Sequence, residues 1–395
     1  MNRRHMLKTA IAASVGVAGA PPASLFAHAR HRQTAAQANE ILYLNPASGR
    51  DNNSGTKDAP LKSLGEFAQR VNASTGTGAF TALLAEGVYS VDETVLLSPK
   101  NRTFTREQRL TIRAEILPDD PEWNVGRMPT LIHTMPLGSS WNGRPDPLGG
   151  VADGILIETS HVTIQGLRIL GIPVVESPKP GQIRRLYAIS RLRRDLEDLE
   201  VAQCLLVGDE LIAPNHVSII ANGNGVRVHH CIFRGQKISV VYWTPGSTGH
   251  ALRHCVLHDL YGSAVWTSGV ANDFEYRNNV VSDCNYIWTA QGGASALADA
   301  AGRGGRQATA QTKEAVHYKI IDSYLAHNRR LAGSGTGARL EYQDIDPSFL
   351  EMIGTKTAEQ AISFERDQSR RNYLHPVAGS EAAKIGAGLF MKSVP

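Results

Sequence analysis

Polar side chains able to do acid–base chemistry recur at one place in a run of similar segments. They are Arg234, Lys237, His258, Asp259, Tyr261 and Asp283. A lyase acting on a uronic acid needs a base for the C5 proton and a cation to neutralise the carboxylate, and Lys237 or His258 with Arg234 suits those roles. A hydrolase needs two carboxyl groups flanking the glycosidic bond, and Asp259 with Asp283 is the candidate pair.

A second interpretation of the same residues is structural. Asp, Asn and Gly are favoured in turns for backbone reasons alone, so Asp259 and Asp283 also fit the role of turn formers. His258 equally fits a turn cap, and Lys237 fits a solvated surface charge. Both interpretations stay open from the sequence.

Three tryptophans follow these turns in a common pattern of apolar residue, Trp and Thr. They are Trp243, Trp266 and Trp288. Alternation along a strand predicts that all three point outward from one sheet, where with Tyr261 they would bind an extended polysaccharide. The alternatives are a covering loop, or a register shifted by one residue, which would bury them.

The elements that carry these residues are repeats. Segments 228–233, 252–257 and 276–281 align at intervals of 24 residues. Short strands, turn residues and a period in the low twenties predict a parallel β-helix, in which each coil stacks on the next. Equivalent positions then form inward ladders, and the ladder read from the alignment is Cys204, Cys231, Cys255, Asn279 and Ser323. We expect buried thiols there, with Cys284 outside the ladder.

Histidines beside this ladder raise the question of a metal. If Cys231 faces inward, alternation places His230 outward and His229 inward, with His254 next to His230 on the following coil. Two histidines do not make a metal site, so no metal ligands are assigned and no cofactor is expected with certainty.

Both ends of the chain resemble secreted right-handed parallel β-helix proteins of the pectate-lyase-like, carbohydrate-active type. The resemblance lies in residues 42–56, 59–64 and 83–89 at the start and 346–349 and 373–380 near the end. It implies polysaccharide lyases, glycoside hydrolases or uronan epimerases, sometimes dependent on Ca²⁺. Residues 230–237 are similar to the lysine-bearing stretch of alginate and chondroitin lyases, but Lys237 stands one position late, and Trp266 stands where those lyases carry an arginine.

The predicted architecture is all-β: a single-stranded right-handed parallel β-helix over residues 30–395, with a short N-terminal capping helix at 65–72. Residues 1–29 read as an export signal, because Arg3 and Arg4 precede a short apolar run and a small-x-small cleavage site. A periplasmic or secreted location through twin-arginine export is therefore expected, with no membrane insertion.

Charge excludes a nucleic-acid footprint. The chain of 395 residues carries a formal charge of +4, and three of its basic residues lie in the signal.

The leading hypothesis is a polysaccharide lyase; a glycoside hydrolase and a non-catalytic binding protein or epimerase are the alternatives.

Overall fold

A computed structural model describes residues 39–135, 140–141, 144–145, 150–171, 185–208, 216–290, 316–335 and 342–392. The chain divides into two units, Met1–Ala35 and Ala36–Pro395, and the described residues all belong to the second. The predicted export signal and the 290–313 insertion, apart from Ala290, lie outside the described residues. Within the described part, no helix combines the length and hydropathy needed to span a bilayer.

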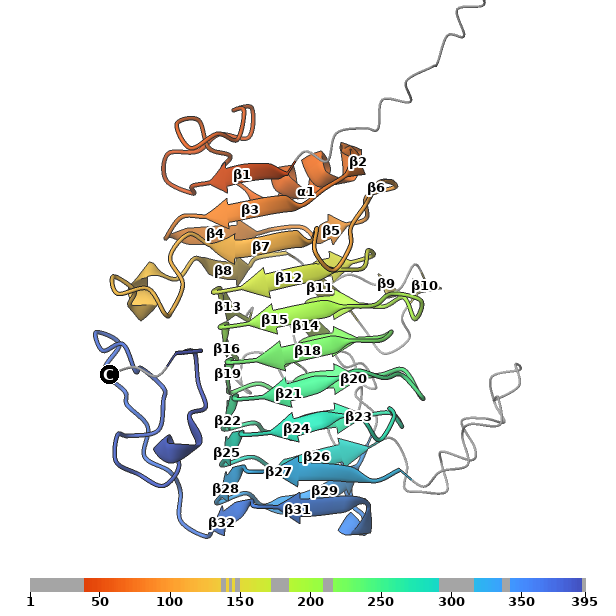
Figure 1. Ribbon diagram of the computed structural model, residues 1–395, viewed down its shortest axis with the longest axis vertical. Helices are drawn as coiled ribbons and strands as arrows, with labels where there is room; N and C mark the ends of the chain where they lie inside the picture. The colour runs from red at the N-terminus through yellow and green to blue at the C-terminus, as the bar shows by residue number, and fades with distance from the viewer. Residues whose placement is uncertain are drawn as a thin grey trace, which may run out of the picture. The chain divides into compact units, whose positions relative to one another are not determined.

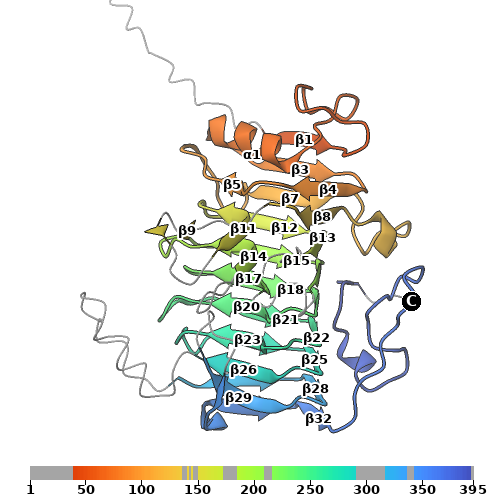
Figure 2. The same cartoon turned by 180° about the vertical axis from the view of Figure 1, so that it is seen from behind.

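Three parallel sheets wind around a common core (Figures 1 and 2). Sheet 1 consists of β1 (Glu40–Leu44), β3 (Phe80–Leu84), β7 (Leu110–Ala114), β12 (Val162–Gln165), β15 (Leu199–Ala202), β18 (Val226–His229), β21 (Ala251–Arg253), β24 (Glu275–Arg277), β27 (Tyr318–Ile321) and β31 (Leu350–Ile353). Sheet 2 consists of β4 (Val88–Val91), β8 (Thr130–His133), β13 (Arg168–Leu170), β16 (Leu205–Val207), β19 (Ile232–Arg234), β22 (Val256–His258), β25 (Val280–Ser282), β28 (Tyr324–Ala326) and β32 (Lys356–Ala358). Sheet 3 consists of β5 (Val95–Leu97), β11 (Val151–Ile157), β14 (Arg185–Arg191), β17 (His216–Ala221), β20 (Ile238–Tyr242), β23 (Ser263–Thr267), β26 (Tyr286–Ala290), β29 (Arg330–Ser334) and the antiparallel β30 (Gln343–Asp344).

Minor elements complete the described chain. They are the pairs β2 (Thr75–Thr77) with β6 (Asn101–Thr103) and β9 (Ser140–Trp141) with β10 (Arg144–Pro145), and the short 3₁₀ turns Val125–Arg127, Pro347–Phe349 and Ala383–Ile385. Because each coil contributes one strand to each sheet in turn, the parallel β-helix predicted from the repeat is confirmed.

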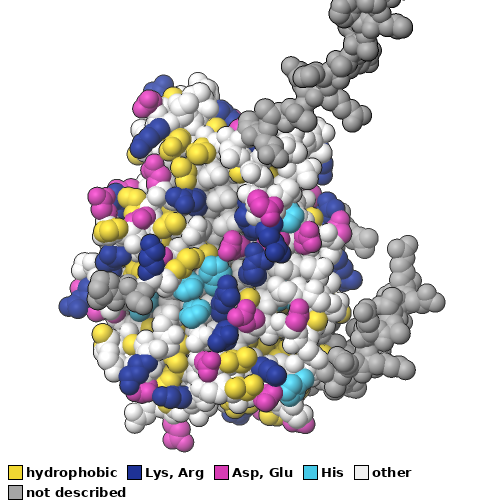
Figure 3. All heavy atoms as spheres, in the orientation of Figure 1, with side chains coloured by type: hydrophobic (Ala, Val, Ile, Leu, Met, Phe, Trp, Pro, Cys, Tyr) yellow, Lys and Arg dark blue, Asp and Glu magenta, His cyan; other side chains and the backbone are white. Residues whose placement is uncertain are grey.

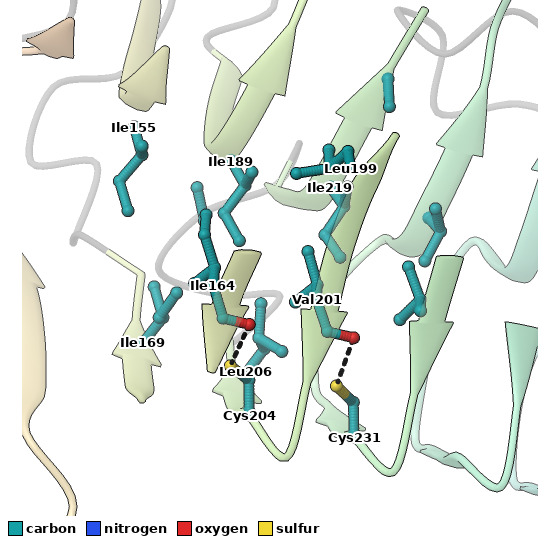
Figure 4. Close-up of a cluster of buried hydrophobic side chains, with 14 of the residues drawn as sticks. Ile155, Ile164, Ile169, Ile189, Leu199, Val201, Cys204, Leu206, Ile219 and Cys231 are labelled. Atoms are coloured by element: carbon teal, nitrogen blue, oxygen red, sulfur yellow. Dashed lines mark hydrogen bonds between the residues drawn. The ribbon is translucent and has the colours of Figure 1, made fainter. Parts of the chain in front are cut away.

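Inward side chains of all three sheets form one continuous apolar core (Figure 4). The predicted ladder at the corner between sheets 1 and 2 is present, because Cys204, Cys231, Cys255, Asn279 and Ser323 are all fully buried. The Asn279 side chain accepts from the backbone N–H of Cys255 at 2.9 Å and donates to Leu252 O at 2.8 Å. Polar rungs are thus tolerated in the core because each one satisfies a corner peptide group. All four cysteines are free and buried, as expected.

The first coil is covered by α1 (Leu64–Ala73), close to the predicted 65–72. Ser63 caps its start by accepting from the Glu66 N–H at 3.1 Å. Its buried residues recur at helical spacing, Leu64, Phe67, Ala68 and Val71, and join the main core. The helix therefore closes an end of the core that would otherwise meet water.

The outer face of sheet 2 carries a second cover. Figure 2 shows residues 362–392 beside this sheet. Phe364, Leu374 and Leu389 belong to one buried cluster with Ile232 and Val256. Trp123, Val125 and Met128 join the same cluster, so this part of the face is shared between the solenoid and the segments that pack on it.

Candidate functional site

The predicted tryptophan ladder is wrong. Strand pairing aligns Trp266 with Val241 and Thr289, whereas Trp288 aligns with Val265. Trp288 therefore lies one residue out of step, and a shift of one residue sends a side chain to the other face of the sheet. The sequence contained a sign of this shift. The tryptophan follows the ladder residue of its own coil by 12 residues in the first coil, 11 in the second and 9 in the third.

The three indoles occupy different environments. Trp288 is fully buried in the main core, stacked on Tyr318 at 5.0 Å, and its Nε1 donates to Thr267 at 3.0 Å. Trp266 faces outward but is 2% exposed, and its Nε1 donates to Gly335 O at 3.0 Å. Trp243 is half-buried beside it, with ring centroids 6.4 Å apart. No exposed sugar-stacking row forms from these residues.

Lys237 is also not a solvated charge. It is fully buried at the start of β20, and its Nζ lies 5.5 Å from the centroid of the Tyr342 ring. Burial, assisted by Arg185, lowers the pKa of Lys237 to about 7. Tyr261 is half-buried nearby, and its hydroxyl accepts from the His216 N–H at 3.2 Å. Neither side chain belongs to the group that contains His258.

The remaining predicted residues do meet, at the corner between sheets 2 and 3. Arg234 and His258 are register partners, and His258 Nδ1 lies 3.3 Å from Oδ2 of Asp283. The exposed Asp259 adjoins them in the turn. Both aspartates have positive φ, 57° and 58°, so the turn-former interpretation holds for their backbones.

The C-terminal segment closes over this corner. Phe364 lies against the His258 ring at 4.3 Å, and Nη2 of Arg366 is 3.2 Å from His258 Nε2. Burial lowers the pKa of His258, although Asp283 opposes that shift. His258 is only 7% exposed, so a polymer would reach it only if this segment moved.

The richest polar cluster lies elsewhere, on the outer face of sheet 1. Figure 3 shows histidines gathered near the middle of this face, beside basic and acidic side chains. Strand pairing creates two outward rows. One contains Thr163, Glu200, Arg227, Ala251 and Glu275, and the other contains Gln165, Ala202, His229, Arg253 and Arg277.

Asp198 anchors the upper part of this face. Its carboxylate forms an ion pair with Arg109 and accepts from His161 at 2.8 Å and from Arg227 at 2.6 Å. Burial opposes ionisation, but the hydrogen bonds from His161, Arg109 and Arg227 outweigh it and lower the pKa of Asp198. Asp198 is thus a fixed anion that holds two arginines in place.

Below it, a chain of contacts runs from a carboxylate to a solvent-accessible imidazole. Glu200 Oε1 is 3.1 Å from His229 Nε2, and His229 Nδ1 is 3.1 Å from Nδ1 of His230. His230 in turn stacks on His254 with ring centroids 4.8 Å apart. His229 is buried and His230 is half-buried. We call Glu200, His229 and His230 the relay.

The relay has a defined electrostatic state. The hydrogen bond from His229, against the effect of burial, lowers the pKa of Glu200 to about 2. Burial, with His229, His254 and Arg253 nearby, lowers the pKa of His230 to about 3. At neutral pH an ionised carboxylate is therefore linked through His229 to a neutral terminal imidazole, whose lowered pKa makes it a weaker base than a free histidine.

The expected inward orientation of His229 is wrong. His230 has φ 51°, and Gln203, His254 and Asn278 have the same left-handed backbone at the equivalent corner. Because His230 bends the chain between sheets 1 and 2, the in-and-out alternation of side chains is interrupted there. His229 therefore points outward, while Cys231 points into the core. The outward row was visible in the sequence as His229, Arg253 and Arg277, each two residues before the ladder.

The described part of the chain contains no metal centre beside the relay. Among the described residues, no group of three or more His, Cys, Asp or Glu has a geometry able to hold a metal ion.

Similarity to known proteins is found in structure and not in sequence. No protein-family model matches the chain, and no curated protein matches it in sequence. Several solved structures are similar to the chain in three dimensions. The GH136 lacto-N-biosidase from Eubacterium ramulus has 14% identity and a TM-score of 0.43, and the match covers 80% of this chain and 55% of that one. A rhamnogalacturonan lyase has 11% identity and a TM-score of 0.45, covering 74% of this chain and 69% of that one.

A pectin methylesterase solved in complex with a hexasaccharide has 12% identity and a TM-score of 0.39, over 91% of this chain and the whole of that one. The chain is similar to these solved structures, and it spans about half the length of the biosidase. At these identities the similarity concerns the fold alone.

Proposed function

We propose that the protein is an exported, periplasmic or secreted polysaccharide lyase that cleaves a uronic-acid-containing glycan on the outer face of sheet 1. The observation that carries this proposal is the relay, which ends in the neutral, half-buried His230 beside an arginine. Arg253 is the register partner of His229. Its side chain is 38% exposed and forms an ion pair with Glu275 at 3.4 Å, so a substrate carboxylate would share it with Glu275. A base and a carboxylate-neutralising cation, the two groups that elimination needs, therefore stand side by side.

The protons can be assigned so that both relay contacts are satisfied. Nε2–H of His229 donates to Glu200, and Nδ1–H of His230 donates to Nδ1 of His229. This leaves the lone pair on Nε2 of His230 available. That atom takes the C5 proton, the C–H electron pair forms the C4=C5 double bond, and the C4–O bond breaks. The leaving oxygen takes a proton from water or from the imidazolium.

A two-carboxylate hydrolase on the same face is less well supported. Its acid must be protonated at working pH, which requires a raised pKa. Asp198 and Glu200 both have lowered pKa values, so neither carboxyl retains a proton near neutrality.

The test uses the full-length protein with a polyuronate and with a neutral glucan, following absorbance from unsaturated ends together with new reducing ends. Elimination predicts that both signals rise with the polyuronate and that neither rises with the glucan. The matched variants are His230→Gln and His317→Gln. His317 is also a histidine paired with a carboxylate beside sheet 1, 3.1 Å from Glu351, but it lies outside the relay.

Three results would contradict the proposal. Reducing ends without absorbance would indicate hydrolysis and return attention to Asp259 and Asp283. Unchanged elimination in His230→Gln would remove the relay from the mechanism. Binding of the polyuronate without either signal would indicate a non-catalytic protein.

A further inference from the structure

The two ends of the solenoid are finished differently. At the N-terminal end, α1 covers the core and a loop of the same chain pairs with the free edge of β1. Tyr43 N–H donates to Gly55 O, and Leu61 N–H donates to Tyr43 O, both at 2.8 Å. Asn72 of α1 donates to Leu96 O of β5 at 2.7 Å. At this end the chain therefore satisfies its own strand edges.

The C-terminal end lacks such a cover. β31 and β32 are the last strands of sheets 1 and 2, and within the described ranges no strand pairs with their free edges. Figures 1 and 2 show both strands at the end of the solenoid, where the segment after β32 turns back along its side. An unpaired edge of this kind is a template for a strand of another chain.

The last rung of the core is exposed at this end. In the register of β27 and β31, Ile320 pairs with Met352 and Tyr318 pairs with Leu350. Ile320 and Tyr318 are buried in the main core, so Leu350 and Met352 hold the inward positions of the next coil. Met352 is nevertheless 45% exposed. An apolar side chain at an inward position in contact with water is stabilised when another surface buries it.

The backbone of β31 is oriented for pairing. Ile353 O accepts from the Asp322 N–H of the preceding coil at 2.8 Å. Successive residues of a strand direct their peptide groups to opposite edges, so the N–H and C=O of Met352 point to the free edge. If a second β31 lies there antiparallel, with Met352 opposite Met352, the two residues exchange both of their hydrogen bonds.

Charge favours that register over its alternative. Directly opposite residues of an antiparallel pair share a face, so the inward Met352 must lie opposite Leu350 or Met352 of the other strand. The pairing with Leu350 sets Glu351 opposite its own copy, and like charges directly opposite are destabilising. The pairing of Met352 with its own copy sets Glu351 opposite Ile353 and avoids that repulsion.

We propose that the C-terminal end of the solenoid binds a second copy of this chain, with the two β31 strands antiparallel about a two-fold axis through Met352. Leu350 and Met352 of both copies are then buried in one shared core. Because this patch is self-complementary and α1 closes the other end, association stops at a dimer and does not continue as a filament. The outer faces of sheet 1 then face the same direction, with both relays on one side of the dimer.

Light scattering during size-exclusion chromatography of the full-length protein, over a range of concentrations, measures the mass. The wild type should have twice the mass of the single chain. Met352→Lys places a charge at the centre of the pair and should weaken dimerisation at least about tenfold. Met391→Lys is the matched control, because Met391 is 41% exposed and lies outside β31, and it should stay dimeric. Equal circular dichroism spectra of both variants would show that the loss concerns the interface.

Cysteine substitution tests the register. The two Met352 Cα atoms of the proposed pair are about 5.5 Å apart, which a disulfide spans, so Met352→Cys should form a linked dimer under oxidation. Glu351→Cys should not, because its two copies are out of register and farther apart than about 7 Å. The native cysteines are buried and should not compete. A non-reducing gel gives the readout.

Three results would overturn the proposal. One is a wild type that is monomeric at every concentration, or a dimer that Met352→Lys leaves intact. Another is a larger oligomer, which would mean that the open end stacks on a different surface of the next copy. The third is linkage of Glu351→Cys without linkage of Met352→Cys, which would rule out a two-fold axis through Met352.

Discussion

The outer face of sheet 1 and the corner between sheets 2 and 3 both carry histidine beside carboxylate, but they differ in what surrounds the pair. On sheet 1, one ring nitrogen of His229 contacts Glu200 and the other contacts the half-buried His230. At the corner, His258 lies beside Asp283 and beneath Phe364 and Arg366 of the C-terminal segment. The same two residue types therefore form an accessible relay in one place and a covered contact in the other.

The difference teaches that residue type and position within the repeat do not decide access. A β-helix presents equivalent positions on every coil, so chemistry depends on which face a later segment covers. Here residues 362–392 cover part of sheet 2 and reach the corner with sheet 1, where the N–H of Gly388 donates to His254 O at 3.0 Å. Figure 3 shows charged side chains on the outer face of sheet 1.

The largest expected effect separates the two histidines. His230→Gln should lower the rate of elimination by about 10² to 10⁴, the range for loss of a general base, whereas His258→Gln should change it little. The measurement is the initial rate of absorbance increase on a polyuronate. The comparison breaks if His258→Gln is the more damaging variant.

Replacing a core tryptophan should destabilise the protein far more than replacing a surface tryptophan, and this difference is the second largest expected. Trp288→Ala removes a fully buried indole and should lower the free energy of unfolding by about 3–5 kcal/mol. Trp243→Ala, at a half-buried indole, should cost about 1 kcal/mol. Urea unfolding followed by circular dichroism measures both. Equal losses would mean that Trp288 is not in the core.

Arginines offer a third contrast. Arg253→Gln should lower kcat/KM about 10² to 10³, because it removes the cation that stabilises the developing charge. Arg366→Gln changes the cover over His258 and should leave kcat/KM near that of the wild type. Similar losses in both variants would point to the covered corner as the working site.

Acid should destabilise the relay in a defined window. The pKa of His230 is lowered to about 3, so the folded state binds fewer protons than the unfolded chain below the ordinary histidine value. The stability that this gives is present above about pH 6.5 and is lost as pH falls toward 3. Glu200, lowered to about 2, loses its contribution between about pH 4.5 and 2.

Thermal melting from pH 7 to 4 measures this effect, which should be the smallest of the four. His230→Gln should show a shallower fall in melting temperature than the wild type, and His317→Gln should match the wild type. An identical fall in wild type and His230→Gln would mean that folding does not lower the pKa of His230.

Parts of the candidate site could be predicted from sequence and parts could not. The aligned repeats placed Arg234 and His258 on neighbouring strands and Asp283 beside them, and the structure brings these three together. The repeats could not reveal the cover, because Phe364 and Arg366 are more than 100 residues from His258 in the chain. The sequence did not predict the relay, because side-chain alternation was assumed to continue past His230. Its left-handed backbone instead turns the corner between the sheets.

The sequence by itself determined the coil. Intervals of 24 residues, an inward ladder of Cys204, Cys231, Cys255, Asn279 and Ser323, and the capping helix follow from local pattern, since each coil contacts only its neighbours. Tertiary structure alone decided where chemistry can occur. One residue of register sent Trp288 into the core, burial removed Lys237 from solvent, and the C-terminal segment closed the corner around His258. Those outcomes depend on turn length and long-range packing, which a repeat does not encode.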